Sequence, residues 1–107
     1  MISDAQLGQI LGKYAELETA LSAGHSKEGD FVGLSKEYAD MGPAVEIARQ
    51  LHSLRSEVVG LEEILADADV DAEMRSIATE ELKEHGEALP KIEQRLQVLL
   101  LPKDEAD

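Results

Sequence analysis

The sequence predicts an all-α protein, an antiparallel helical bundle of three to four helices built on a long helical hairpin. Three observations support this fold class. Apolar residues recur at three- and four-residue spacing along most of the chain, which is the periodicity of a helix face. Residues that favour helix ends stand before and after these runs, and no segment shows the strict apolar–polar alternation of a strand.

The first expected helix begins after Ser3, because Ser3 and Gln6 have the spacing of a capping box. One apolar stripe follows: Leu7, Ile10, Leu11, Tyr14, Leu17 and Leu21. Gly24 suits the left-handed conformation that closes a helix. Gly8 and Gly12 are four residues apart and would permit a close helix approach, but we expect them only to loosen this helix.

A short helix is expected next, over residues 31–41, with Asp30 as its cap. Its inward-facing residues are predicted to be Phe31, Leu34, Tyr38 and Met41. Gly42 and Pro43 are expected to end this helix and to start the next, because proline at the first helical position lacks a donor that would be unpaired anyway. The next helix carries a seam at alternating spacings of three and four: Ala44, Ile47, Leu51, Leu54, Val58, Leu61, Leu65 and Ala68. Such a seam spans about 25 residues, or close to 40 Å of helix.

Residues 67–72 form a predicted turn, and Asp71 is the expected cap of the last helix. The last helix carries a second seam with the same alternating spacing: Ala78, Leu82, His85, Leu89, Ile92, Leu96 and Leu99. Two long seams joined by a short turn lie antiparallel, and the first helix is expected to cover this hairpin with a third stripe. Pro90 clashes with the carbonyl of Gly86, so we expect a kink near residues 86–90 without a break, because the seam keeps its phase.

The chain has 23 acidic and 10 basic residues, a formal net charge of −13. So few cations make it a poor primary binder of RNA or DNA, whereas its field would attract a basic protein surface. Acidic surfaces are also common on helical domains without such a partner. The chain has no cysteine, no targeting signature and no apolar run of about 20 residues. We therefore expect a soluble, cytoplasmic protein.

No catalytic, cofactor-binding or metal site is predicted, and we expect no enzyme activity. His25, His52 and His85 do not have the spacing of zinc ligands. His85 follows Glu81 by four residues, so the two side chains could meet on one turn.

The carboxylates do not form a predicted site either. Asp67, Asp69 and Asp71 resemble the start of a calcium loop, but Ala72 and Ala78 stand where that loop needs glycine and glutamate. They are better explained as a solvated turn before a helix. Pairs such as 62–63 and 80–81 lie on expected exposed faces and not in the concave site that acid–base catalysis requires.

Three segments carry a resemblance to a known family: residues 34–41, residues 74–84 and the junction at residues 96–104, which contains Leu101-Pro102-Lys103-Asp104. Together they resemble the N-terminal domain of bacterial class I peptide chain release factors, most closely the release factor one type. The resemblance implies that residues 1–101 form this helical domain and that residues 102–107 begin a linker to domains outside the sequence.

The resemblance also implies a function in translation termination. Members recognise a stop codon on the ribosome, UAA or UAG in this type, and trigger hydrolysis of peptidyl-tRNA. Their catalytic Gly-Gly-Gln and codon-reading Pro-Xaa-Thr tripeptides do not occur in this sequence. The expected role is therefore a docking or positioning module. Its expected partners are the ribosomal factor-binding region near the stalk base and a partner GTPase release factor, with no membrane and little direct nucleic-acid binding.

Two alternatives remain open at this stage. A self-associating helical bundle or chaperone-like protein unrelated to translation would also show sustained seams with polar flanks, and it would form a stable oligomer. A self-contained acidic mimic of nucleic acid is the third possibility.

Overall fold

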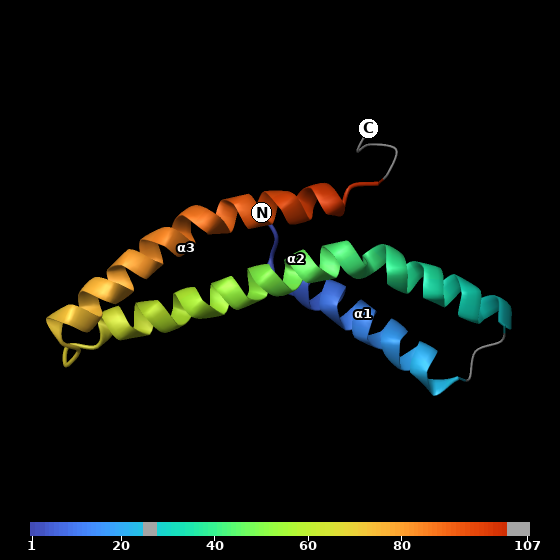
Figure 1. Cartoon of the computed structure of the whole chain (residues 1–107), viewed down its shortest axis with the longest axis horizontal. Helices are drawn as coiled ribbons and strands as arrows, with labels where there is room; N and C mark the ends of the chain where they lie inside the picture. Colours follow the sequence, from blue (N-terminus) through green and yellow to red (C-terminus); the bar gives the residue numbers. More distant parts are fainter. Residues whose placement is uncertain (25–27, 103–107) are drawn as a thin grey trace.

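The computed structural model describes residues 1–24 and 28–102, which form three helices and no strand. They are α1 (Asp4–Ala23), α2 (Glu28–Ala66) and α3 (Ala72–Leu99). The long helix α2 packs against α1 along its first half and against α3 along its second half, so two antiparallel pairs share one central helix (Figure 1). The molecule is elongated, 61 × 35 × 18 Å. The predicted all-α fold built on a helical hairpin is confirmed.

Helix α1 begins and ends at the predicted residues. The Ser3 backbone N–H donates to Gln6 Oε1 at 2.8 Å, and the Gln6 N–H donates to Ser3 Oγ at 3.1 Å, which completes the capping box. Gly24 has a φ of 66° and closes the helix in the left-handed conformation. A Cβ atom added to Gly8 or Gly12 would meet nothing within 4 Å, so neither glycine serves a close helix approach, as predicted.

Helix α2 differs from the prediction at Gly42 and Pro43, which do not end a helix. Residues 28–66 form one continuous helix with Pro43 inside it. The missing N–H leaves the Ala39 carbonyl without its usual donor, and a proline inside a helix costs about 3 kcal/mol or more. Burial of the residues that follow offsets this cost: Ala44, Val45, Ile47 and Ala48. The ribbon of α2 therefore bends in its green stretch and continues (Figure 1).

The start of α2 also differs from the prediction. The helix already begins at Glu28, so Asp30 lies inside it and is not its cap. Phe31 is 48% exposed and not part of the core. Among the described helices, only α1 runs beside this end of α2 (Figure 1), so a large side chain there is covered from one side at most.

Helix α3 begins at the predicted cap, where the Met74 N–H donates to Asp71 Oδ1 at 2.7 Å. The chain stays helical through Pro90, as predicted, and the ribbon of α3 is curved along its length (Figure 1). The last residue of each of the two predicted seams does not belong to the core. Ala68 lies in the turn after α2 and is exposed, and Leu99 is 45% exposed because a groove opens there between α3 and α2.

The main core lies where all three helices meet residues 1–3, which precede α1 and which we call the N-terminal arm. Its buried members are Ile2, Leu7, Ala44, Ile47, Ala48, Leu51 and Leu96. The sequence pattern missed Ile2, which precedes the first helix, and Val45 and Ala48, which lie off the predicted seam. α2 is buried on more than one face here, since α1 and α3 both pack against it. The first helix therefore covers the first half of α2, and not the whole hairpin as expected.

Candidate functional site: docking surfaces

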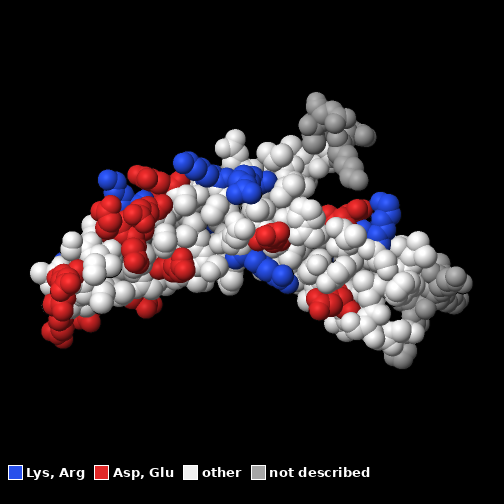
Figure 2. Space-filling view, in the orientation of Figure 1, with Lys and Arg blue, Asp and Glu red and all other residues white. Residues whose placement is uncertain are grey.

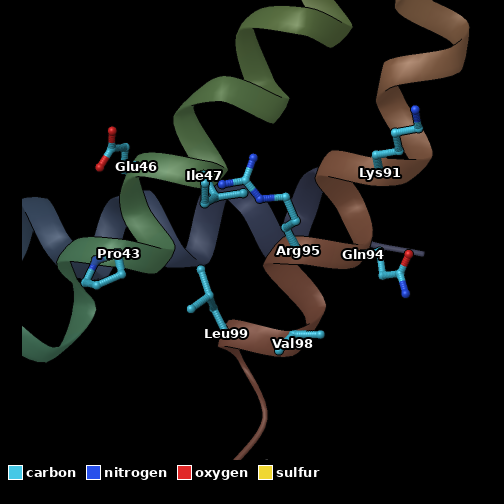
Figure 3. A pocket seen from close by; sticks show the side chains of 8 residues that line it. All are labelled: Pro43, Glu46, Ile47, Lys91, Gln94, Arg95, Val98 and Leu99. Atoms are coloured by element: carbon cyan, nitrogen blue, oxygen red, sulfur yellow. The ribbon is translucent and has the colours of Figure 1, made fainter.

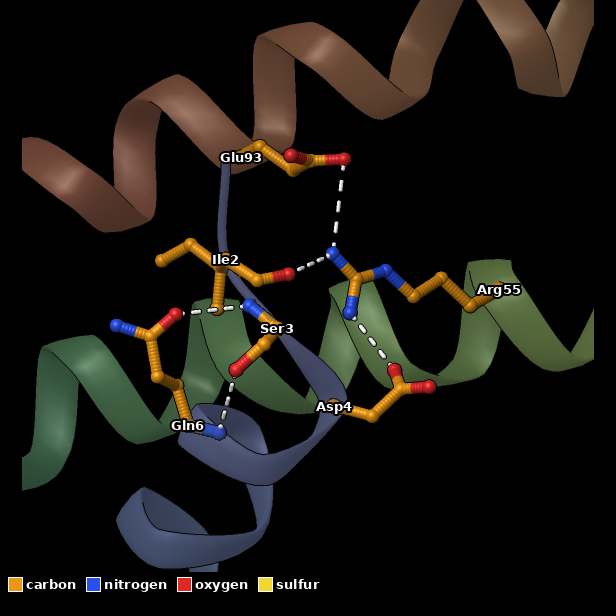
Figure 4. A network of polar contacts seen from close by, with 6 residues as sticks. All are labelled: Ile2, Ser3, Asp4, Gln6, Arg55 and Glu93. Atoms are coloured by element: carbon orange, nitrogen blue, oxygen red, sulfur yellow. Dashed lines mark hydrogen bonds and ion pairs between the residues drawn. The ribbon is translucent and has the colours of Figure 1, made fainter.

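Arg55 of α2 joins the N-terminal arm, α1 and α3 (Figure 4). Its Nη1 donates to Asp4 Oδ1 at 2.9 Å, and its Nη2 donates to the Ile2 carbonyl oxygen and lies 3.6 Å from Glu93 Oε1. The Arg55 and Glu93 side chains are only 22% and 14% exposed. These contacts hold the Ile2 side chain in the core and set how the two helix pairs meet. Sequence reasoning missed Arg55, whose only signal is its place next to Leu54 of the seam.

The far end of the α2–α3 hairpin carries most of the negative charge. Residues 57–87 contain eleven carboxylates and two cations, a net charge of −9 out of −13 for the chain. The carboxylates are Glu57, Glu62, Glu63, Asp67, Asp69, Asp71, Glu73, Glu80, Glu81, Glu84 and Glu87, and all of them are exposed. In the space-filling view, acidic side chains gather over this end, at the left (Figure 2). We call residues 57–87 the acidic hairpin end.

The turn of this hairpin is held by its own polar groups. Arg75 Nη1 donates to the Leu65 carbonyl at 2.9 Å, one of the carbonyls in the last turn of α2. Its Nη2 donates to the Asp67 carbonyl at 3.0 Å, which also accepts the Val70 N–H at 3.4 Å. Asp67 Oδ1 accepts the Asp69 N–H at 2.9 Å. Arg75, one of the two cations at this end, therefore stabilises the turn through the backbone, and its charge is included in the net −9.

A cavity of about 500 Å³ lies on the side of the acidic hairpin end, with Glu57, Glu81, Glu84 and His85 among its lining residues. His85 Nε2 is 3.1 Å from Glu57 Oε2, so His85 links α3 to α2; its partner is Glu57 and not Glu81, the neighbour that the sequence spacing allowed. Within residues 1–24 and 28–102, no group of three or more His, Asp or Glu side chains is arranged to hold a metal ion. His52 is exposed, and His25 lies outside the described residues.

The α1–α2 pair contains a stacked aromatic pair. The centres of the Tyr14 and Tyr38 rings lie 4.3 Å apart, and the two ring planes differ by 10°. The Arg49 guanidinium lies 5.7 Å from the centre of the Tyr14 ring. A hydrogen bond with Tyr14, loss of hydration and the nearby Glu18 carboxylate raise the pKa of Tyr38 to about 12. These rings are half-buried packing residues and leave no exposed platform for stacking a base.

A groove of about 680 Å³ runs between the middle of α2 and the last turns of α3 (Figure 3). Pro43, Glu46 and Ile47 come from α2, and the other lining residues come from α3: Lys91, Gln94, Arg95, Val98 and Leu99. We call this the α3-end groove. It combines aliphatic walls with two cations one helical turn apart, and sequence reasoning did not predict it.

Comparisons with known proteins identify the family. Residues 10–107 match the PCRF domain. This chain belongs to the PCRF domain family. It is 41% identical over 106 residues to a protein of Erythrobacter litoralis named Peptide chain release factor 1, covering 99% of this chain and 29% of the relative. The protein of that name from Novosphingobium aromaticivorans is also 41% identical over 106 residues, covering 99% and 28%.

The resemblance predicted from the sequence is therefore confirmed. A third relative, Peptide chain release factor 1 of Ehrlichia canis, is 34% identical over 108 residues, covering 100% of this chain and 30% of the relative. The chain thus spans less than a third of the length of these relatives and corresponds to their N-terminal part. No solved structure matches the chain significantly. Among the described residues, no helix has both the length and the hydropathy of a bilayer-spanning segment.

Proposed function

We propose that this chain is the N-terminal domain of a translation termination factor of the release factor one type, and that it docks and positions the rest of the protein on the ribosome. The observation that carries the proposal is the similarity to release factor 1 proteins along nearly the whole chain. In this proposal residues 1–101 form the domain and residues 102–107 begin the linker. The end of α3 at Leu99 supports that division.

The acidic hairpin end is the proposed docking surface. Its net charge of −9 would attract a basic protein and repel phosphates. We propose a basic ribosomal protein of the factor-binding region near the stalk base as its partner, and a partner GTPase release factor as a second one. The absence of the Gly-Gly-Gln and Pro-Xaa-Thr tripeptides from the sequence supports a domain that neither hydrolyses peptidyl-tRNA nor reads the codon.

The assignment to a termination factor is tested by reading the source gene beyond the codon for Asp107. The proposal expects an open frame of a few hundred codons that encodes Gly-Gly-Gln. A frame without that tripeptide would refute the assignment to a termination factor, and the acidic hairpin end could still be tested by itself.

Docking is tested by biolayer interferometry between the purified chain and stalk-base ribosomal proteins at low and high salt. A double charge reversal, Glu80→Lys with Glu81→Lys, should weaken binding by about tenfold or more, and binding should fall as salt rises because exposed charges are screened. Glu16→Lys on α1 together with Glu46→Lys on α2, both at exposed positions, changes the net charge by the same amount; it is the matched control and should change the affinity less than about twofold. Equal losses in both variants would show that only the net charge matters.

Self-association is the second candidate function, and one observation favours it. Several aliphatic side chains are exposed at the ends of the α2–α3 pair: Met74, Ile77, Val98, Leu99, Leu100 and Leu101. A self-associating bundle would bury them between copies and would sediment as a dimer or larger species. The docking proposal expects a monomer in sedimentation velocity at micromolar concentration.

A further inference from the structure

We propose that the α3-end groove binds a short acidic amphipathic helix of a partner protein, through aliphatic contacts on its floor and ion pairs to Lys91 and Arg95. This inference concerns a surface other than the acidic hairpin end. It does not depend on the function proposed above.

The first argument is the exposed apolar surface at this end of α3. Val98, Leu99, Leu100 and Leu101 are between 43% and 52% exposed, and the first two line the groove with Pro43 and Ile47. Val98 and Leu99 thus place exposed aliphatic surface beside a concavity, and exposed apolar patches mark interaction sites more often than bare surface. An occupant with an apolar face would cover this surface.

The second argument is the position of the two cations. Lys91, Arg95 and Val98 recur at four- and three-residue spacing, so they share one face of α3. In the close-up, the Arg95 side chain extends from α3 toward α2, where Ile47 lies, whereas Glu46 points away from both cations (Figure 3). Within residues 1–24 and 28–102, neither Lys91 nor Arg95 takes part in an ion pair. Both are free to bind carboxylates at the rim.

The third argument is electrostatic. The net charge of −13 of the whole chain opposes the binding of an acidic ligand, so the local charge at the groove decides. The charge is unevenly placed. Residues 88–102 contain two cations and one carboxylate, Glu93, and Glu93 faces Arg55. The nearest carboxylate of the acidic hairpin end, Glu87, lies about 12 Å along α3 from Arg95 and about 6 Å from Lys91, compared with a Debye length of about 8 Å at physiological salt. Arg95 is therefore the cation that is better screened from that end. Among the lining residues the two cations outnumber the one carboxylate, Glu46, so the groove itself favours a ligand with negative charge.

The size and chemistry of the groove select a helix over a nucleic acid. Its wall on α3 runs from Lys91 to Leu99, about 12 Å or two helical turns, which matches the helix-in-groove mode of recognition. No aromatic side chain lines it, so it lacks the stacking platform on which single-stranded nucleic acid depends. An aliphatic floor with a cationic rim fits leucine-type side chains flanked by glutamates.

The experiment uses a fluorescein-labelled model peptide of about 14 residues, with leucines on one face and glutamates on the flanks, long enough for four helical turns. Anisotropy titration gives its affinity for the chain, and methyl NMR shifts locate its site. The inference expects saturable binding, with the largest shifts at Ile47, Val98 and Leu99. A peptide with lysines in place of the glutamates should bind at least about tenfold more weakly.

Single charge reversals at two exposed lysines of α3 form a matched pair. Lys91→Glu should weaken binding about tenfold, because it replaces an attraction by a repulsion at the rim. Lys83→Glu changes the net charge by the same amount within the acidic hairpin end and should change the affinity less than about twofold. Circular dichroism of both variants verifies that the helices persist.

Four outcomes would overturn the inference. The first two are an equal loss of peptide affinity in Lys91→Glu and Lys83→Glu, and methyl shifts centred on residues 57–87. The third is tighter binding of a single-stranded RNA of similar length than of the acidic peptide. The fourth is a second copy of the chain in the groove, seen by sedimentation and by NMR on dilution.

Discussion

Replacing Leu96 by alanine tests the three-helix junction most sharply. Leu96 is 0% exposed and belongs to the cluster that includes Ile2 and Leu51. Removing three carbons costs about 2.4 kcal/mol at about 0.8 kcal/mol per buried methylene. The cavity left between three helices adds about 1 kcal/mol, so we expect a total loss of about 3–4 kcal/mol.

Leu99→Ala is the matched control, because it makes the same change one turn later on a side chain that is 45% exposed. It should cost less than about 1 kcal/mol. Leu54 is half-buried, and Leu54→Ala should fall between the two.

The assay is urea unfolding followed by far-UV circular dichroism. With a slope of about 1–2 kcal/mol per molar urea, the midpoint of Leu96→Ala should fall by about 2 M while the slope stays unchanged. Equal costs for Leu96→Ala and Leu99→Ala would refute the junction, because they would show that α3 does not bury Leu96 against α1 and α2.

Three further predictions concern polar groups. Arg55→Met should lower the free energy of unfolding by about 1–3 kcal/mol, because it leaves the half-buried Glu93 unpaired; an undiminished urea midpoint would contradict this. Asp71→Ala should lower the free energy of unfolding by about 1 kcal/mol in the same assay, because it removes the cap of α3; an unchanged free energy would show that the cap is dispensable. Ultraviolet titration should place the pKa of Tyr38 at about 12, and Tyr14→Phe should lower it. Since folding raises this pKa above 10, the stabilisation from the neutral phenol is full below pH 10 and is lost as the pH rises towards 12; a Tyr38 titration near 10 would be contrary to this account.

Local signals in the sequence predicted much of the fold. The Ser3–Gln6 capping box, the Gly24 closure and the Asp71 cap each depend on a few neighbouring residues, and all three are present. The fold class followed from periodicity, which needs only one buried face per helix. The prediction failed at Pro43, because the burial that carries α2 through the proline comes from two other helices and is not visible in the local pattern.

The two proposed docking surfaces were predictable in part. The excess of carboxylates in residues 57–87 is visible in the sequence, although their common location depends on the hairpin turn. The α3-end groove was not predicted, because its walls are about 45 residues apart in the chain and meet only where the bent α2 passes the end of α3. Arg55 was missed for the same reason, since its partners precede α1 and lie on α3.

The most direct test of the central claim is site-specific photocrosslinking of the chain to purified ribosomes. A benzoylphenylalanine is placed at Met74 in the acidic hairpin end and, in a control, at Val32 near the start of α2; both positions are exposed. The account predicts crosslinks to a basic ribosomal protein from position 74 and few from position 32. Crosslinks from position 32 alone, or from position 74 to ribosomal RNA, would contradict the claim that the acidic hairpin end docks onto protein.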